Sequence, residues 1–278
     1  MGKCFFSLEI HADNDANTIL NEIDLGEKLG YDAVWLGDSQ LIWREVYVLL
    51  GAAAKVTSRI WLGTGITNPI TRLPVVTASA ITTLQELSGG RAVLGVARGG
   101  SSVRTLGMKP ATLATLEQFV NQVRELCSGK TVVAPRCEVR LSFGAPEKCP
   151  PIIVAASGPK TLQLAGRIGD GVIISAGTPR SGLQKTMDYI QAGFKERTLP
   201  QDNFQTIFMR DAAIHTDRKT ALAAVRPHVA RNLLTYADVS EAATTVKKEL
   251  QAEYMNTAPN LVFPLRHLKS VGRLCTHI

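Results

Sequence analysis

Residues 152–175 read IIVAASGPKTLQLAGRIGDGVIIS, and this stretch decides the fold. It opens on five apolar residues, Ile152–Ala156, passes through a segment of helical spacing from Lys160 to Ile168, and returns to an apolar run, Gly171–Ser175. Strands of a parallel sheet that is covered on both faces read as continuous apolar runs of this kind. The stretch therefore predicts a strand–helix–strand unit with parallel strands.

The same unit recurs along the chain in both directions, as short apolar runs that alternate with helical segments. The predicted strands are Cys4–Ile10, Ala33–Leu36, Ile60–Gly65, Ala92–Ala97, Ile152–Ala156, Gly171–Ser175 and Gln205–His215. Seven repeats without a linker predict an α/β fold with a parallel sheet. Polar and glycine-rich residues follow several different strands rather than one. This favours a closed barrel, spanning residues 1–278 as one domain, over an open doubly wound sheet.

Composition narrows the class of protein. The 278 residues are 45% apolar and 20% charged. The sequence has no run of about 18 apolar residues, so no membrane span is predicted. The five cysteines are scattered without a CxxC pair, which argues against zinc and redox motifs and for reduced thiols in a cytoplasmic protein. The net charge of +7 is dispersed rather than clustered, so a basic surface that attracts an anionic small molecule is favoured over nucleic-acid binding.

The chemistry of a parallel barrel lies at the carboxyl ends of its strands. Glu9 and Asp38 are carboxylates on apolar strands, a costly placement unless each is paired, solvated or functional. Gly63 and Gly65 lie at the end of a buried strand, where glycine marks either a barrel corner or something pressed on the backbone, such as a flat ring. No pattern of metal ligands is present, and none is predicted.

The segment SGPKT, residues 157–161, has the chemistry of a phosphate cradle. Gly158 lets the backbone approach a ligand closely, Pro159 suits the first turn of a helix, and the free N–H groups of that turn attract an anion. The segment is not a Walker A loop, which needs an earlier glycine and a Gly-Lys-Ser/Thr run. From spacing alone, a plain strand-to-helix turn remains an equal alternative.

Four blocks of the sequence, in order, resemble the bacterial luciferase-like enzymes, and more narrowly their deazaflavin-dependent branch, typified by methylenetetrahydromethanopterin reductase. The resemblance covers about residues 5–214. The blocks are GYDAVWLGD at 30–38, LGTGITNPITR at 62–72, LSGGRAVLG at 87–95, and GPK, LAG and GDGV within 158–172. The family's fold is a TIM-type (β/α)8 barrel. The implied function is an oxidoreductase that transfers a hydride between coenzyme F420, a deazaflavin, and a small organic substrate.

The resemblance also implies roles for individual residues. A non-proline cis peptide between Gly65 and Ile66 would support the deazaflavin ring, Asp38 would lie near the ring, and Glu9 would handle a proton near the substrate. Asp38 and Glu9 are thus the implied catalytic residues. The implied cofactor-binding residues are Gly65, Ile66, Thr67, Asn68, Ala97, Ala156, Ser157, Gly158, Pro159, Lys160, Thr161, Gly177 and Thr178. Relatives commonly pair, which implies a homodimer or a higher homo-oligomer.

Residues 131–143 interrupt the alternation of strands and helices and predict a β-hairpin insertion.

The sequence departs from the family pattern at two points. After the fourth strand it reads Ala97-Arg98-Gly99-Gly100, where the family carries an acidic residue in a Gly-Pro-Gly-Asp pattern, and this puts the pterin substrate in doubt. The tail, residues 256–278, is atypical, so the eighth βα unit is truncated or altered. Leu261–Leu265 is a candidate eighth strand, although Pro264 argues against a central position. The alternatives are therefore an FMN-dependent monooxygenase and an inactive, truncated barrel that still binds cofactor.

Overall fold

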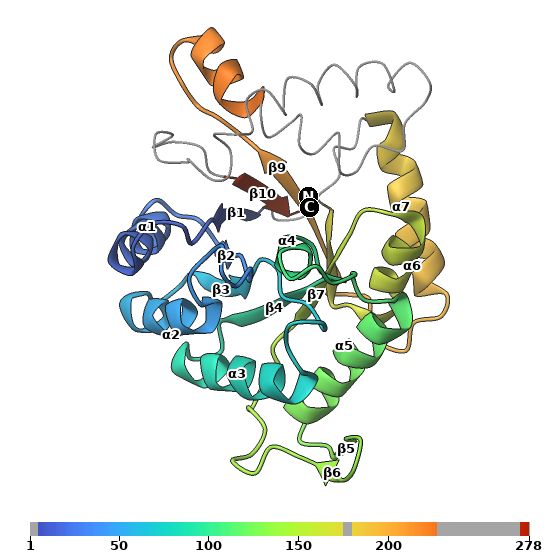
Figure 1. Ribbon diagram of the computed structural model, residues 1–278. Helices are drawn as coiled ribbons and strands as arrows, with labels where there is room; N and C mark the ends of the chain where they lie inside the picture. The colour runs from blue at the N-terminus through green and yellow to red at the C-terminus, as the bar shows by residue number, and fades with distance from the viewer. Residues whose placement is uncertain (1–4, 175–179, 227–272, 278) are drawn as a thin grey trace.

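The computed structural model describes residues 5–174, 180–226 and 273–277, and these residues form a closed barrel with helices around it (Figure 1). The order of strands around the barrel is β1-β10-β9-β8-β7-β4-β3-β2. Apart from β10, the seven other strands of the barrel run parallel to one another. They are β1 (Phe5–Ile10), β2 (Ala33–Leu36), β3 (Trp61–Thr64), β4 (Ala92–Val96), β7 (Ile152–Ala156), β8 (Gly171–Ile174) and β9 (Gln205–Asp211). The predicted α/β barrel is confirmed.

The eighth position of the barrel is filled in an unexpected way. The strand β10 (Arg273–His277) runs antiparallel to both of its neighbours, with Cys275 in register with Ser7 of β1 and Met209 of β9. The eighth unit is thus altered, as the sequence predicts, yet the barrel closes. Closure removes the two unpaired sheet edges that a seven-stranded barrel would expose. The candidate strand at 261–265 lies outside the described residues.

Helices follow most of the strands and form the outer layer (Figure 1). Their starts are set by local capping: the Asp15 carboxylate accepts the backbone N–H of Thr18, and the Thr112 hydroxyl accepts that of Thr115. The helices are α1 (Ala16–Lys28), α2 (Val46–Val56), α3 (Pro74–Leu87), α4 (Ser101–Arg104), α5 (Leu113–Cys127), α6 (Pro159–Ile168) and α7 (Arg180–Phe194), and residues 218–226 are also helical.

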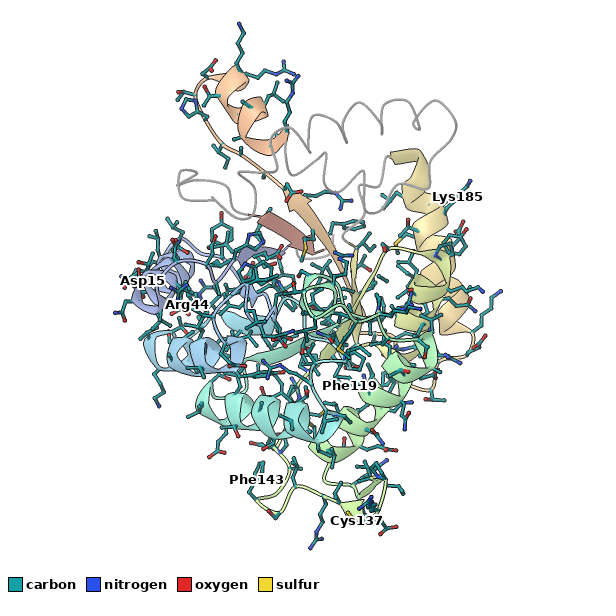
Figure 2. All side chains as sticks on the ribbon, viewed as in Figure 1. Asp15, Arg44, Phe119, Cys137, Phe143 and Lys185 are labelled. Carbon is teal, nitrogen blue, oxygen red and sulfur yellow. The ribbon has the colours of Figure 1, made fainter. Side chains whose placement is uncertain are left out.

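A β-hairpin occupies the segment where the sequence predicts an insertion. Strand β5 (Val132–Val133) pairs antiparallel with β6 (Glu138–Val139) between α5 and β7. In Figure 2 the labelled side chains of Cys137 and Phe143 project from this region, away from the barrel. The insertion therefore lies at the end of the barrel where parallel strands begin, opposite the end where barrel chemistry occurs.

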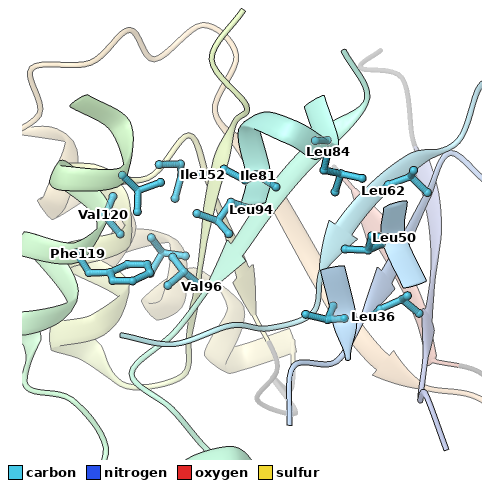
Figure 3. Packing of buried hydrophobic residues seen from close by; sticks show 14 of the residues in the cluster. Leu36, Leu50, Leu62, Ile81, Leu84, Leu94, Val96, Phe119, Val120 and Ile152 are labelled. Atoms are coloured by element: carbon cyan, nitrogen blue, oxygen red, sulfur yellow. The ribbon is translucent and has the colours of Figure 1, made fainter. Parts of the chain in front are cut away.

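Two hydrophobic clusters hold the barrel together. The larger one packs the outward faces of the strands against the helices, and Figure 3 shows Leu36, Leu62 and Leu94 of the strands among Leu50 and Ile81 of the helices. The smaller one fills the barrel interior and consists of Ala33, Trp35, Val93, Ile153, Ile173, Ile207 and Met209. Alternate residues of each strand thus serve the two clusters, as the period of two in a strand requires.

Candidate functional site

The carboxyl ends of the seven parallel strands lie together at one end of the barrel. Two partly buried apolar residues pack on the interior cluster: Ile66, two residues after β3, and Ala155, near the end of β7. Ala156, which the sequence predicts in the cofactor site, belongs instead to the outer cluster and is 4% exposed. Because neighbouring strand residues face opposite ways, Ala155 faces the interior, and Ala156 can reach a ligand there only through its backbone.

The bare backbone at Gly63 and Gly65 accommodates a side chain of the protein itself. A Cβ atom on Gly63 would lie 2.5 Å from the Trp35 ring, and one on Gly65 would lie 2.7 Å from Trp35 Cβ. The indole lies in the barrel interior, where its Nε1 donates to Ser7 Oγ at 3.1 Å. Of the two sequence interpretations, the flat ring pressed on the strand is therefore correct for Gly63, and the ring is that of Trp35.

The segment after β3 is fixed to the next strand. The peptide bond between Gly65 and Ile66 is cis, at the position that the sequence predicts. Thr67 then forms a parallel bridge with Val96 of β4: its N–H donates to Gly95 O at 3.0 Å, and its carbonyl accepts the N–H of Ala97 at 3.0 Å. Ala97, also predicted in the site, thus lies directly beside Thr67.

Asp38 is paired within the protein. Its carboxylate is 4% exposed and accepts hydrogen bonds from Thr67 Oγ1 at 2.6 Å, from Arg72 Nε at 2.6 Å and from Arg72 Nη2 at 2.9 Å. Two parallel N–H donors on one carboxylate give the strongest form of ion pair. The structure thus brings the predicted residues Asp38 and Thr67 together. Through these bonds, Asp38 holds the loop that follows β3.

Arg72 is the centre of this cluster. Its guanidinium also pairs with Glu45 and lies 4.8 Å over the ring of Tyr47. Burial alone would lower the pKa of Arg72, but its bonds to Asp38 and Glu45 outweigh burial and hold the pKa above its ordinary value. Burial raises the pKa of the Tyr47 hydroxyl, with the Asp38 carboxylate adding to the effect. The cluster therefore carries a permanent cation at neutral pH.

Asn68 shapes the turn after the cis peptide. Its side-chain oxygen accepts the N–H groups of Ile70 and Thr71, both at 3.0 Å. Its side-chain amide donates to Thr71 Oγ1 at 2.9 Å and to Ser102 Oγ, in α4, at 3.0 Å. These four bonds use the hydrogen-bonding capacity of the side chain. Asn68 thus fixes the loop and ties it to α4.

Glu9 faces the barrel interior near its open end. Ser7, two residues earlier on the same face of β1, accepts the bond from Trp35, and the Glu9 side chain is 5% exposed. His11 Nε2 lies 3.7 Å from Glu9 Oε1, and the His11 ring stacks on Trp43 with ring centres 5.0 Å apart. The structure thus places a carboxylate and an imidazole side by side at the end of β1.

The predicted phosphate cradle is open. Gly158 is the N-cap of α6, no side chain caps this helix, and Pro159 occupies its first turn. A Cβ on Gly158 would meet no atom within 4 Å, and Ser157, Pro159 and Lys160 are exposed. The Thr161 N–H donates to Gly158 O at 3.1 Å, which leaves it a weaker donor for a ligand. Gly177 and Thr178 lie outside the described residues.

Sequence reasoning did not predict Trp43 or Tyr47. The Trp43 Nε1 and the Tyr47 hydroxyl are both buried without a hydrogen-bond partner in the described part of the chain. The available signal for Trp43 was the glycine of the Gly37-Asp38-Ser39 turn. A Cβ on Gly37 would lie 2.1 Å from the Trp43 ring, so only glycine fits there. Arg72 was noticed only as part of a motif, since nothing local links it to Asp38.

No group of three or more His, Cys, Asp or Glu side chains in the described part of the chain could hold a metal ion. Among the described helices, none combines the length and apolar character that crossing a membrane requires.

Comparison with known proteins places the chain. The family described as luciferase-like monooxygenase matches residues 4–271. The 5,10-methylenetetrahydromethanopterin reductase of Archaeoglobus fulgidus is 34% identical over 232 residues, which are 81% of this chain and 69% of that protein. An F420-dependent glucose-6-phosphate dehydrogenase of Microbacterium testaceum is 29% identical over 228 residues, 76% of this chain and 68% of that protein.

A solved structure agrees with these matches. The coenzyme F420 dependent tetrahydromethanopterin reductase of Methanopyrus kandleri superposes with a TM-score of 0.73 at 25% identity, over 85% of this chain and 74% of that one. Family match, relatives and fold point the same way: the chain belongs to the luciferase-like monooxygenase family.

Proposed function

We propose that this chain is an F420-dependent oxidoreductase that transfers a hydride between the deazaflavin and a small organic substrate. Relatives that match over more than two thirds of their length are named as F420-dependent dehydrogenases or as methylenetetrahydromethanopterin reductases. The observation in this chain that carries the proposal is the open N-terminus of α6 at Gly158, at the end of the barrel where the family's cofactors would bind.

The residues present fit such a cofactor. The position of a Cβ on Gly158 is open, so a phosphate can approach the backbone of the first turn of α6. Lys160 is exposed beside it and adds a positive charge. Ile66 and Ala155 offer apolar surface on the interior cluster for a flat ring. When bound, the deazaflavin would supply the ring carbon that accepts or donates the hydride.

The protein's own residues would then position and protect the reacting groups. Asp38, with Thr67 and Arg72, holds the loop on which Ile66 lies, so we assign Asp38 a positioning role. Glu9 is the carboxylate that we propose to hold or move a proton, at its Oε1 atom beside His11 Nε2. A fixed loop limits the motion of ring and substrate, which is how a barrel lowers the entropic barrier to hydride transfer.

Two finer features of the proposal rest on the resemblance: a homodimer or higher homo-oligomer, and contacts of Gly177 and Thr178 with the cofactor tail. A cytoplasmic location is proposed from the scattered cysteines without a CxxC pair. The pterin substrate itself is left open, because Arg98 occupies the stretch after β4. Its Nε donates to Ala111 O at 2.5 Å, so part of this side chain fixes the loop before α5.

Titration of the purified chain with coenzyme F420, followed by visible absorption, tests the proposal. Saturable binding of F420 with no binding of FMN supports it, whereas binding of FMN alone transfers the assignment to a flavin monooxygenase. Binding of F420 without reduction by any candidate substrate, among alcohols, sugar phosphates and pterins, indicates the inactive barrel. Binding of neither cofactor rejects both enzyme assignments.

The location of the cradle is tested by substitution. Gly158→Leu places a side chain in open space, so the fold persists, but binding of F420 is expected to fall at least roughly tenfold because the phosphate loses its approach. Lys160→Gln should weaken binding less, and more at low salt than at high salt. Lys185→Gln, on the outer surface of α7 (Figure 2), is the matched control and should change nothing. Unchanged affinity in Gly158→Leu rules out this cradle.

A further inference from the structure

The connections that follow β2 and β4 expose large apolar side chains. These connections are residues 37–45 and 97–112, and both follow the carboxyl ends of parallel strands, so they lie at the same end of the barrel. Leu41 in the shorter connection is 82% exposed, and Leu106 and Met108 in the longer one are 45% and 48% exposed. Three large apolar side chains thus face solvent at this end of the barrel.

Hydrogen bonds join the two connections into one surface. Gln40 Nε2 donates to Ser102 O at 2.8 Å, and Asn68, from the connection after β3, donates to Ser102 Oγ at 3.0 Å. The longer connection is closed at its base, because the Ala111 N–H donates to Arg98 O at 2.8 Å and Arg98 Nε donates to Ala111 O at 2.5 Å. The exposed apolar side chains are therefore carried by a fixed surface rather than by independent loops.

Leu41 has a backbone conformation that leucine seldom adopts. Its φ is 69°, and among the described residues no other non-glycine residue has a positive φ. This left-handed conformation is unfavourable for a residue with a branched apolar side chain. The strain directs the side chain toward solvent, where it packs on nothing in the chain. An outlier of this kind is a reason to look for a role in binding.

The charges of the two connections leave an excess of cations. Their two acidic residues, Asp38 and Glu45, both pair with Arg72 of the connection after β3. Arg44 acts electrostatically on the nearby Asp15 carboxylate. The longer connection has no acidic residue, and its three cations are exposed and form no ion pair in the part of the chain that the structure describes: Arg98, Arg104 and Lys109.

We propose that six residues form a rim that binds the surface of a membrane containing anionic lipids: Leu41, Leu106, Met108, Arg98, Arg104 and Lys109. The apolar side chains would enter the boundary between headgroups and acyl chains, and the cations would attract the lipid phosphates. The strength of such peripheral binding follows the apolar area that is buried and the attraction to anionic lipids.

The composition of the rim favours a membrane over a protein partner. A stable protein interface needs a continuous complementary surface of about 800 Å² on each partner. A few protruding apolar side chains beside cations of one sign are enough for peripheral binding to lipid. The proposal rests on these side chains alone, so it holds or fails independently of the cofactor and of the reaction.

Cosedimentation of the full chain with lipid vesicles tests the proposal. One set of vesicles is phosphatidylcholine alone, and the other contains phosphatidylglycerol as one third of its lipid. The chain is expected to sediment with the anionic vesicles and to remain in the supernatant with the neutral ones. Added salt should release it, because screening weakens the attraction of the cations to the lipid phosphates.

Two pairs of substitutions locate the contact. Leu41→Asn with Met108→Gln removes the apolar contact, and asparagine tolerates the left-handed backbone, so the fold should persist in circular dichroism. The partition coefficient onto anionic vesicles should then fall at least roughly tenfold. Arg104→Gln with Lys109→Gln should lower it roughly fivefold for each cation removed.

The matched control removes the same charge from the opposite end of the barrel. Arg136→Gln with Arg140→Gln takes two exposed cations from the hairpin segment and should leave the partition coefficient nearly unchanged. Phe143→Gln removes an exposed apolar side chain there, labelled in Figure 2, and should have no effect either.

Four results overturn the proposal. One is the absence of sedimentation with anionic vesicles. Another is an equal loss in the hairpin pair and the Arg104 and Lys109 pair, which means that binding follows net charge alone. The third is a variant with Leu41→Asn and Met108→Gln that sediments like the parent. The fourth is a change of that variant from dimer to monomer in size-exclusion chromatography without vesicle binding by the parent, which assigns the rim to a second copy of the chain.

Discussion

Replacement of Asp38 by Asn tests whether this carboxylate supports the loop after β3. The change keeps the shape of the side chain but removes the charge that accepts two bonds from Arg72 and one from Thr67. Removing one partner of a buried ion pair costs about 3–5 kcal/mol. The Arg72 side chain is 20% exposed and keeps Glu45 as a partner, so the expected loss is smaller, about 2–3 kcal/mol.

Urea denaturation at pH 7, followed by far-ultraviolet circular dichroism, measures this loss. The transition midpoint should fall while the slope stays constant, because the change affects stability and not the surface exposed on unfolding. Glu45→Gln is the matched control: its side chain is 45% exposed, so the loss should stay below about 1 kcal/mol. The double variant Asp38→Asn, Arg72→Met removes both charges and should be more stable than the sum of the single losses predicts.

The outcome separates two roles for Asp38. A loss of stability with a coupling energy of roughly 1.5 kcal/mol or more to Arg72 supports the positioning role. If Asp38→Asn is as stable as the parent and yet loses hydride transfer, the carboxylate acts on the ligand directly, and the assignment made from the ion pair is wrong. Equal stability together with unchanged activity removes Asp38 from the site altogether.

Three further predictions concern the framework. Burial would raise the pKa of Glu27, but N–H bonds from Ile60, Ser58 and Arg59 outweigh it and bring the pKa to about 2. Glu27→Gln should therefore cost about 1–2 kcal/mol at pH 7, since the group is partly exposed, and the difference should vanish as pH falls from about 4.5 to 2 in melts at stepped pH. Gly95→Ala should abolish soluble folded protein, because its Cβ would lie 2.1 Å from Thr64 O. Gly51→Ala, inside α2 with 3.9 Å of clearance, should instead raise stability by about 0.5–1 kcal/mol in the same melts.

The parallel strands were predictable because strands that are buried on both faces consist mostly of apolar residues. Ile152–Ala156 was predicted with the bounds that the structure shows, and β2 likewise, since a strand covered on both faces has few polar residues. The strand β10 carries no such signal. Its sequence, RLCTH, is neither continuously apolar nor flanked by a helical pattern, and its antiparallel register is set by β1 and β9. Pairing partners far away in the sequence decide such a strand.

The location of the candidate residues at strand ends was predictable, but their contacts were less so. Motifs located Thr67, Asn68 and Gly158 at strand ends, where the structure also has them. They could not show that Asp38 and Arg72, 34 positions apart, would pair, because an ion pair of this kind depends on the closure of the barrel. A ring pressed on the third strand was among the interpretations of Gly63, but no local pattern identifies the indole of Trp35 as that ring.

These assignments divide the site into a supporting part and a contact part. The side chains of Asp38, Thr67 and Asn68 form hydrogen bonds within the protein that hold the loop after β3. They are therefore suited to supporting the site rather than to binding the cofactor directly. Gly158 borders open space and Lys160 is exposed, so these two residues are the better candidates to contact a cofactor. A site of this kind is expected to lose affinity when the contact part changes and to lose stability when the supporting part changes. Of the two carboxylates predicted for catalysis, this leaves Glu9 as the one to test for proton transfer.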